Sequence, residues 1–226
     1  MKAVVSWSSG KDSALAFHMA RGGSSGSEIE IVGLLTTITS EFGRVSMHGV
    51  RESLLDAQSE SLGLPCWKVP IPHPCPNEVY ERAMARTLGD LRAEGVTAVV
   101  FGDLFLEDLR QYREAKLAGI GMKGIFPLWG RPTAALAREM IRVGLRATIT
   151  CLDPKKLDRS FAGRSLEGTL LADLPDGVDP CGENGEFHTF AWAGPMFPRP
   201  IPIEVCEVVE RGGFVFADVM PTHLER

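Results

Sequence analysis

The stretch Ser6-Trp7-Ser8-Ser9-Gly10-Lys11-Asp12-Ser13 decides the fold, because it joins a short apolar run to a segment of helix-forming residues. Ala3-Val4-Val5 precedes it, and Ala14-Leu15-Ala16-Phe17 follows it. A strand that turns into a helix at small residues points free backbone N–H groups and the positive end of the helix dipole at one place. That place suits a phosphate, and Lys11 adds a cation to it. The stretch therefore predicts a phosphate-binding turn after the first strand of a sheet.

The composition is ordinary for a globular protein, with 226 residues of which 44% are hydrophobic and 23% charged. The net charge of −5 gives no general attraction for nucleic acid, so a nucleic-acid partner is not expected. No apolar run approaches the roughly 20 residues that cross a bilayer, and the N-terminus has no signal-peptide pattern. The five cysteines include no C-x-x-C pair, which argues against a zinc ribbon or a disulfide framework. We expect a cytoplasmic protein with no membrane partner.

Apolar strands alternate with amphipathic helices over the first 150 residues. This alternation predicts an α/β fold with a Rossmann-like parallel sheet and helices on both faces. Gly63 and Gly95 are expected to end two of the helices. In such a sheet the ligand crevice lies at the carboxyl ends of the strands, where Gly102-Asp103 also follows an apolar run. The phosphate-binding turn and Asp103 are therefore expected in one site. Strands are expected near residues 3–5, 29–37, 67–70, 96–101, 124–129 and 145–152. Besides the helix that follows the phosphate-binding turn, helices are expected near residues 54–62, 77–94, 106–118 and 133–143.

The pattern changes near residue 130, after which short elements, glycine and proline are more frequent. Residues 203–209 and 214–219 read as two strands, and Gly212-Gly213 between them predicts a hairpin turn. We therefore expect two domains. Residues 1–130 carry the phosphate-binding turn, and residues 131–226 form a smaller α+β domain.

Residues 179–189 form a second stretch with the residue types of a functional site. Their sequence is Asp-Pro-Cys-Gly-Glu-Asn-Gly-Glu-Phe-His-Thr, and no regular element is expected across it. Glu183, Asn184, Glu186 and His188 could offer acceptors for ammonium, a carboxamide or magnesium on a backbone that bends closely around a substrate. A plain polar turn with solvated carboxylates is the alternative interpretation.

The phosphate-binding turn departs from the two common nucleotide-binding patterns. A Walker A loop would need glycine at Val5 and a hydroxyl residue at Asp12, and a G-x-G-x-x-G pattern fails at Ser8 and Ser13. The turn instead resembles the PP-loop, S-G-G-K-D-S, of ATP pyrophosphatases in the adenine nucleotide alpha-hydrolase superfamily. Ser9 stands where that pattern has its first glycine, which costs little unless the position needs a positive φ.

Together with other matches, the PP-loop makes the chain similar to the diphthine–ammonia ligase family within that superfamily. The run C-G-E-N-G-E-F-H-T at 181–189 is the most specific match, and the resemblance extends from residue 4 to about residue 197. The remaining matches are residues 8–13, Met47-His48, Gly102-Asp103, Arg113-Glu114, Pro127-Leu128-Trp129 and Gly163-Arg164-Ser165-Leu166.

The resemblance implies an ATP-dependent ligase that adenylates a carboxylate, releases pyrophosphate and lets ammonia displace AMP to form an amide. It implies a PP-loop ATP-binding domain at 1–130, a substrate-binding domain at 131–226, and ATP and Mg²⁺ as cofactors. The implied ATP-binding residues are Ser6, Ser8, Ser9, Gly10, Lys11, Asp12, Ser13, His48, Gly102 and Asp103, with Asp12 and Asp103 also as metal ligands. The implied substrate-binding residues are Glu183, Asn184, Glu186 and His188, and the implied catalytic residues are Lys11, Asp12, Glu183 and Glu186.

Several alternatives stay open at the level of the sequence. The acceptor is either protein-bound diphthine or a small acid, for example a corrinoid acid, and assembly into a homo-oligomer is undecided. A PP-loop enzyme that modifies tRNA is a second hypothesis, although thiolating relatives commonly carry paired cysteines that this chain lacks. A nucleotide-binding module without turnover is a third, although a pure sensor needs no second polar stretch at 179–189.

Overall fold

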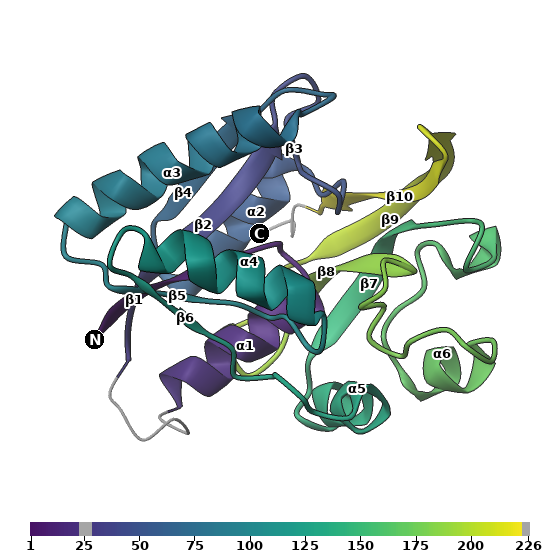
Figure 1. Ribbon diagram of the computed structural model, residues 1–226. Helices are drawn as coiled ribbons and strands as arrows, with labels where there is room; N and C mark the ends of the chain where they lie inside the picture. Colours follow the sequence, from purple (N-terminus) through teal and green to yellow (C-terminus); the bar gives the residue numbers. More distant parts are fainter. Residues whose placement is uncertain (23–28, 223–226) are drawn as a thin grey trace.

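The first sheet consists mainly of parallel strands in the order β4-β2-β1-β5-β6 (Figure 1). The computed structural model describes residues 1–22 and 29–222. The short β3 (Arg44–Val45) pairs antiparallel with the end of β2. The predicted α/β fold with a mostly parallel sheet is therefore confirmed. The parallel strands are β1 (Lys2–Ser6), β2 (Glu30–Thr39), β4 (Cys66–Ile71), β5 (Ala98–Val100) and β6 (Lys123–Ile125).

Helices cover both faces of this sheet, because strand side chains alternate between two apolar clusters. Ala3 and Val5 of β1 belong to the cluster that also contains residues of α1 (Lys11–Arg21) and α2 (Glu52–Leu62). Val4, between them, belongs to a second cluster with residues of α3 (Asn77–Ala93) and α4 (Glu107–Ala118). This arrangement leaves the carboxyl ends of β1 and β5 as one shared edge.

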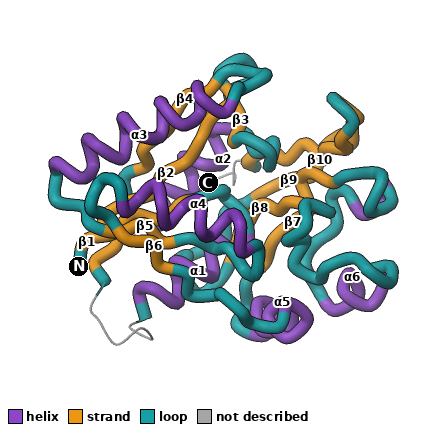
Figure 2. Tube along the Cα trace, in the orientation of Figure 1, coloured by secondary structure: helices purple, strands orange, loops and turns teal. Residues whose placement is uncertain are grey.

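The second sheet is antiparallel, in the order β8-β7-β10-β9, and lies beside α5 and α6 (Figure 2). Gly212 and Gly213 have φ values of 58° and 82° and turn the predicted hairpin between β9 and β10. One expectation is wrong: residues 187–189 begin strand β8 and are not irregular. The elements are α5 (Thr133–Arg142), β7 (Arg146–Leu152), the 3₁₀ turn η1 (Arg159–Phe161), α6 (Gly168–Asp173), β8 (Phe187–Ala193), β9 (Ile203–Arg211) and β10 (Phe214–Pro221).

Strand β8 connects the second sheet to the turn after β1. The backbone N–H of Ala191 donates to the carbonyl of Ser9 at 2.8 Å. The fully buried amide of Gln58, on α2, donates to the carbonyls of Ser9 and Ala191 at 3.1 and 2.6 Å. Its oxygen accepts from the indole N–H of Trp7 at 2.8 Å. Every polar atom of Gln58 therefore holds the turn, α2 and β8 together.

None of the helices in the described part of the chain is both long enough and apolar enough to cross a membrane.

Replacing Gln58 by leucine is expected to lower the free energy of unfolding by about 2–3 kcal/mol, because buried polar groups of Trp7 and Ala191 lose their partner. Urea unfolding measures the change. Gln111→Leu, on the exposed side of α4, is the matched control and should stay within about 0.5 kcal/mol of the wild type. Equal losses in the two variants would contradict this role for Gln58.

Candidate active site

A pocket of about 230 Å³ lies at the carboxyl ends of β1 and β5, where the residues before β8 close over α1. Of the residues implied to bind ATP or substrate or to act in catalysis, Ser9, Gly10, Asn184 and Glu186 do not line it. The others do, so the structure brings the two predicted stretches into one site. The lining residues are Ser6, Ser8, Lys11, Asp12, Ser13, His48, Phe101, Gly102, Asp103, Leu106, Leu109, Arg113, Cys181, Gly182, Glu183, Gly185, Phe187, His188 and Thr189.

The PP-loop, residues 8–13, is held by local hydrogen bonds at the start of α1. Ser13 Oγ donates to the carbonyl of Gly10 at 3.0 Å and lies 3.3 Å from Ser8 Oγ. A Cβ at Gly10 would lie 2.8 Å from Cε1 of His48, so a side chain there would displace the imidazole. At the end of β5, a Cβ at Gly102 would lie 2.8 Å from the backbone of Asp12. Both glycines therefore allow the backbones around the helix N-terminus to pack closely.

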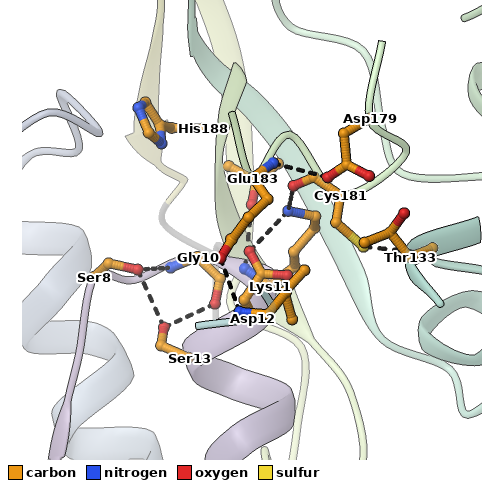
Figure 3. A network of polar contacts seen from close by, with 12 residues as sticks. Ser8, Gly10, Lys11, Asp12, Ser13, Thr133, Asp179, Cys181, Glu183 and His188 are labelled. Carbon is orange, nitrogen blue, oxygen red and sulfur yellow. Dashed lines mark hydrogen bonds and ion pairs between the residues drawn. The ribbon is translucent and has the colours of Figure 1, made fainter. Parts of the chain in front are cut away.

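Lys11 places a buried positive charge where α1 meets the residues before β8 (Figure 3). Its Nζ lies 2.8 Å from Oδ2 of Asp12 and donates to the carbonyl of Cys181. Burial alone would lower the pKa of Lys11, but the nearby acidic groups, Asp12 foremost, together outweigh burial and raise that pKa. The ammonium is therefore charged at neutral pH and available to balance phosphate charge.

Carboxylates outnumber that cation in the pocket. Burial raises the pKa of Asp103, with a smaller contribution from Asp12, although Arg113 Nε lies 2.9 Å from its Oδ2. Burial also raises the pKa of Glu183 to about 7, although its Oε1 accepts from the N–H of Leu104 at 2.8 Å. An added cation would stabilise the charged forms of Asp103 and Glu183, so this side of the pocket favours a metal ion or ammonium.

Asp12 and Asp103 fit a magnesium ion that also has phosphate ligands. Within residues 1–22 and 29–222, no group of three or more His, Cys, Asp or Glu side chains could hold a metal by itself. Mg²⁺ in nucleotide sites typically takes one or two carboxylates together with phosphate oxygens. Oδ1 of Asp12 is buried, with no hydrogen-bond partner in the described chain, so it is available as such a ligand.

The two glutamates near β8 have different surroundings. Glu183 lines the pocket, whereas Glu186 is buried behind it. Oε1 of Glu186 accepts from the N–H of Asp179 and from the amide of Asn184, each at 3.1 Å. Asp179 in turn accepts from the N–H of Glu183 at 2.9 Å. In this geometry Glu183 faces the ligand space, while Glu186 and Asn184 shape the loop that presents it.

His48 and His188 are neutral imidazoles in contact at the pocket wall, with ring centroids 4.6 Å apart and ring planes tilted by 35°. Burial lowers the pKa of His188 to about 4 and the pKa of His48 well below its ordinary value. Nδ1 of His48 lies 3.0 Å from the carbonyl of Thr189, which can only accept, so Nδ1 carries the proton. Nε2 of His48 is then an acceptor, suited to a hydroxyl or an amine rather than to a phosphate oxygen.

Four groups of the site went unassigned in the sequence analysis. Thr189 Oγ1 accepts from the N–H of Lys11 at 3.1 Å, and Arg113 lines the pocket through its pair with Asp103. Both residues lie in stretches that resemble the family, which was their only signal. The Leu104 N–H and the Cys181 carbonyl are backbone groups, and a sequence carries no residue-type signal for these.

Ser9→Gly is expected to raise the free energy of unfolding by about 1 kcal/mol, because Ser9 has a φ of 68°, in the left-handed region. Its fully buried hydroxyl also has no hydrogen-bond partner within the described residues. Thermal unfolding should show a midpoint about 2–4 °C higher. Ser9→Ala keeps the backbone strain and should gain less; a glycine variant no more stable than the wild type would refute the argument.

Glu183→Gln is expected to stabilise the protein above pH 7 and to change little below pH 5. The folded protein holds the Glu183 proton up to about pH 7, whereas the unfolded chain releases it near 4.5. Wild-type stability therefore falls as pH rises through this window, and glutamine removes that loss. The gain at pH 8 should be about 1–2 kcal/mol, less than the full shift implies because Glu183 is only partly buried. Urea unfolding at pH 5 and pH 8 measures it, and equal gains at the two pH values would contradict it.

Comparison with known proteins finds a family match for each half of the chain. Residues 1–124 match the model of the diphthamide synthase N-terminal domain, and residues 132–217 match that of the C-terminal domain. A diphthine–ammonia ligase of Danio rerio is 29% identical over 248 residues, with 97% of this chain and 92% of the relative covered. The diphthine–ammonia ligases of Homo sapiens and Bos taurus are 26% and 25% identical, each with 100% of this chain and 93% of the relative covered. The chain therefore belongs to the diphthamide synthase family.

Proposed function

We propose that the protein is an ATP-dependent ligase that converts a carboxylate to an amide with ammonia and releases AMP and pyrophosphate. One observation carries the proposal beyond family membership: the pocket joins a PP-loop, with its buried Lys11, to Glu183, whose pKa is about 7. A phosphate-binding group and a proton acceptor are the two functions that this reaction needs at one place.

In the first step, an oxygen of the acceptor carboxylate attacks the α-phosphorus of ATP, and pyrophosphate leaves. The N-terminus of α1 and the ammonium of Lys11 stabilise the charge on the leaving group. Asp12 and Asp103 would hold Mg²⁺, which would supply further charge neutralisation on the phosphates. Nε2 of His48 accepts a hydrogen bond from a ribose hydroxyl of the nucleotide.

In the second step, the nitrogen of ammonia attacks the acyl carbon, and the bond to AMP breaks. Glu183 takes the proton from the attacking nitrogen, since a carboxyl with a pKa of about 7 is matched to proton transfer at neutral pH. Leu104 fixes one oxygen of Glu183, and the other remains as an acceptor for the nitrogen. Glu186 and Asn184 act by shaping the loop around Glu183 and not by touching substrate.

Diphthine is the acceptor that we propose, because the similar proteins are diphthine–ammonia ligases and the similarity covers more than nine-tenths of this chain. The same pocket chemistry would serve a small acid, so the acceptor assay includes both. We also propose that residues 1–130 bind the nucleotide and residues 131–226 bind the acceptor, in the cytoplasm and without nucleic acid.

Incubation with ATP, Mg²⁺ and ammonium is expected to yield AMP and pyrophosphate when a diphthine-bearing protein is added, with small carboxylic acids as parallel arms. Lys11→Ala and Glu183→Gln should each lower the rate by about 10²-fold or more, because each removes one of the charges that the reaction uses. Glu139→Gln, which breaks an ion pair on α5 outside the pocket, is the control. Formation of ADP in place of AMP would overturn the mechanism, and product with a small acid alone would overturn the choice of diphthine.

A further inference from the structure

Asp218, on β10, binds the two arginines that flank His48 in the sequence. Its Oδ1 accepts from Arg44 Nη2 at 2.9 Å and from Arg51 Nε at 3.0 Å, and its Oδ2 accepts from Arg51 Nη2 at 2.5 Å. The Asp218 side chain is only 11% exposed. The two guanidiniums lower the pKa of this carboxyl against the effect of burial, so it keeps its charge at neutral pH. Such bidentate, charge-assisted pairing fixes geometry as well as adding energy.

The segment between the two arginines, residues 45–50, is tight and closely packed against β10. Val45 donates to the carbonyl of Val50 at 2.8 Å, and Arg44 Nη1 donates to the carbonyl of Gly49 at 2.7 Å. A Cβ at Gly49 would lie 2.7 Å from the ring of Phe216, two residues before Asp218. Met47 has a φ of 65° while its side chain is 64% exposed. A strained residue without burial of its own persists only where the surrounding contacts fix the backbone.

His48 is the one side chain of this segment that lines the pocket. Its ring lies next to Gly10, its Nδ1 donates to the carbonyl of Thr189, and it makes a tilted ring contact with His188. Within its own segment, the backbone N–H of His48 donates to the carbonyl of Ser46. The segment is held to β2 by the bonds of Ser46 to Thr37 and Thr39. It is held to β10 by the charged contacts of Arg44 and Arg51, which converge on Asp218, so the placement of the ring depends in part on Asp218.

We propose that Asp218 is a positioning residue: through Arg44 and Arg51 it holds His48 over the PP-loop. Asp218 itself is absent from the pocket lining and touches no reacting atom. The consequence for catalysis rests on the proposed function, in which His48 contacts the nucleotide. The positioning of the ring does not rest on it.

The test is NMR of the His48 imidazole in the full chain, with the resonance assigned by its loss in His48→Gln. In Asp218→Asn the ring is expected to leave its half-buried contact with His188, so its resonances shift and its titration moves up towards the ordinary pKa near 6.5. The charged and titratable groups that face the ring are His188 and Lys11, and neither is changed by the substitution. Asp218→Glu should restore part of the wild-type signal, and Glu139→Gln should leave it unchanged. Wild-type His48 resonances in a folded Asp218→Asn protein would overturn the proposal.

Two further measurements separate the possible failures. If circular dichroism shows that Asp218→Asn does not fold, Arg51→Gln takes its place in the test. Arg44 still pairs with Asp218 in that variant, so a smaller shift of the His48 resonances is expected. In the AMP-forming assay, Asp218→Asn should lower kcat/KM for ATP by about tenfold, because misplacement of a site group by about 1 Å can cost up to about 10²-fold and the bond of His48 to Thr189 retains part of the placement. A wild type without turnover would refute the proposed function alone, whereas wild-type kcat/KM together with unmoved His48 resonances would refute the role of Asp218 alone.

Discussion

The hydrogen bonds on the carbonyl of Ser9 are the constraint on which the rest of the site depends. One comes from the backbone of Ala191 in β8 and one from the buried amide of Gln58. A turn that presents its N–H groups to an anion leaves its carbonyl groups pointing the other way, and these need partners. Strand β8 of the antiparallel sheet and Gln58 of α2 supply these partners, and Thr189 of β8 adds a contact to Lys11. The orientation of the PP-loop and the position of the second sheet are thus fixed by the same bonds.

The electrostatics of the pocket follow from that closure. Because β8 and the residues before it cover α1, Lys11 is removed from water and Glu183 partly so, and both respond to neighbouring charge. One ammonium faces carboxylates from three segments of the chain, while both imidazoles stay neutral. The pocket therefore accepts a phosphate at the helix N-terminus and a cation beside it. A ligand that brings both, such as a nucleotide with its metal ion, complements this distribution of charge.

The sequence was informative wherever local chemistry determines structure. Apolar runs identified the parallel strands, Gly63 and Gly95 end their helices with φ values of 66° and 89°, and Gly212-Gly213 turns the hairpin. It was less informative where long-range contacts decide. Nothing in residues 187–189 distinguishes a loop from the first residues of β8, because pairing with β7 makes the strand. Residue types likewise predicted that Glu183 and Glu186 both matter, but the backbone geometry that turns one toward the pocket and the other away has no local signature. Asp218 lies 167 residues from Arg51, so its pairing could not be predicted from spacing.

The hydrogen bonds between β8 and the PP-loop also determine when the site can be completed during synthesis. Lys11 and Thr189 are 178 residues apart, and nearly the whole first sheet lies between them in the chain. A ribosome therefore releases the PP-loop long before the strand that supports it, and loop closure over such a distance is slow to form. Until β8 arrives, the turn after β1 lacks the hydrogen bonds to Ala191 and Thr189, although Gln58 is already present. The proposed nucleotide site is therefore complete only after most of the polypeptide has emerged.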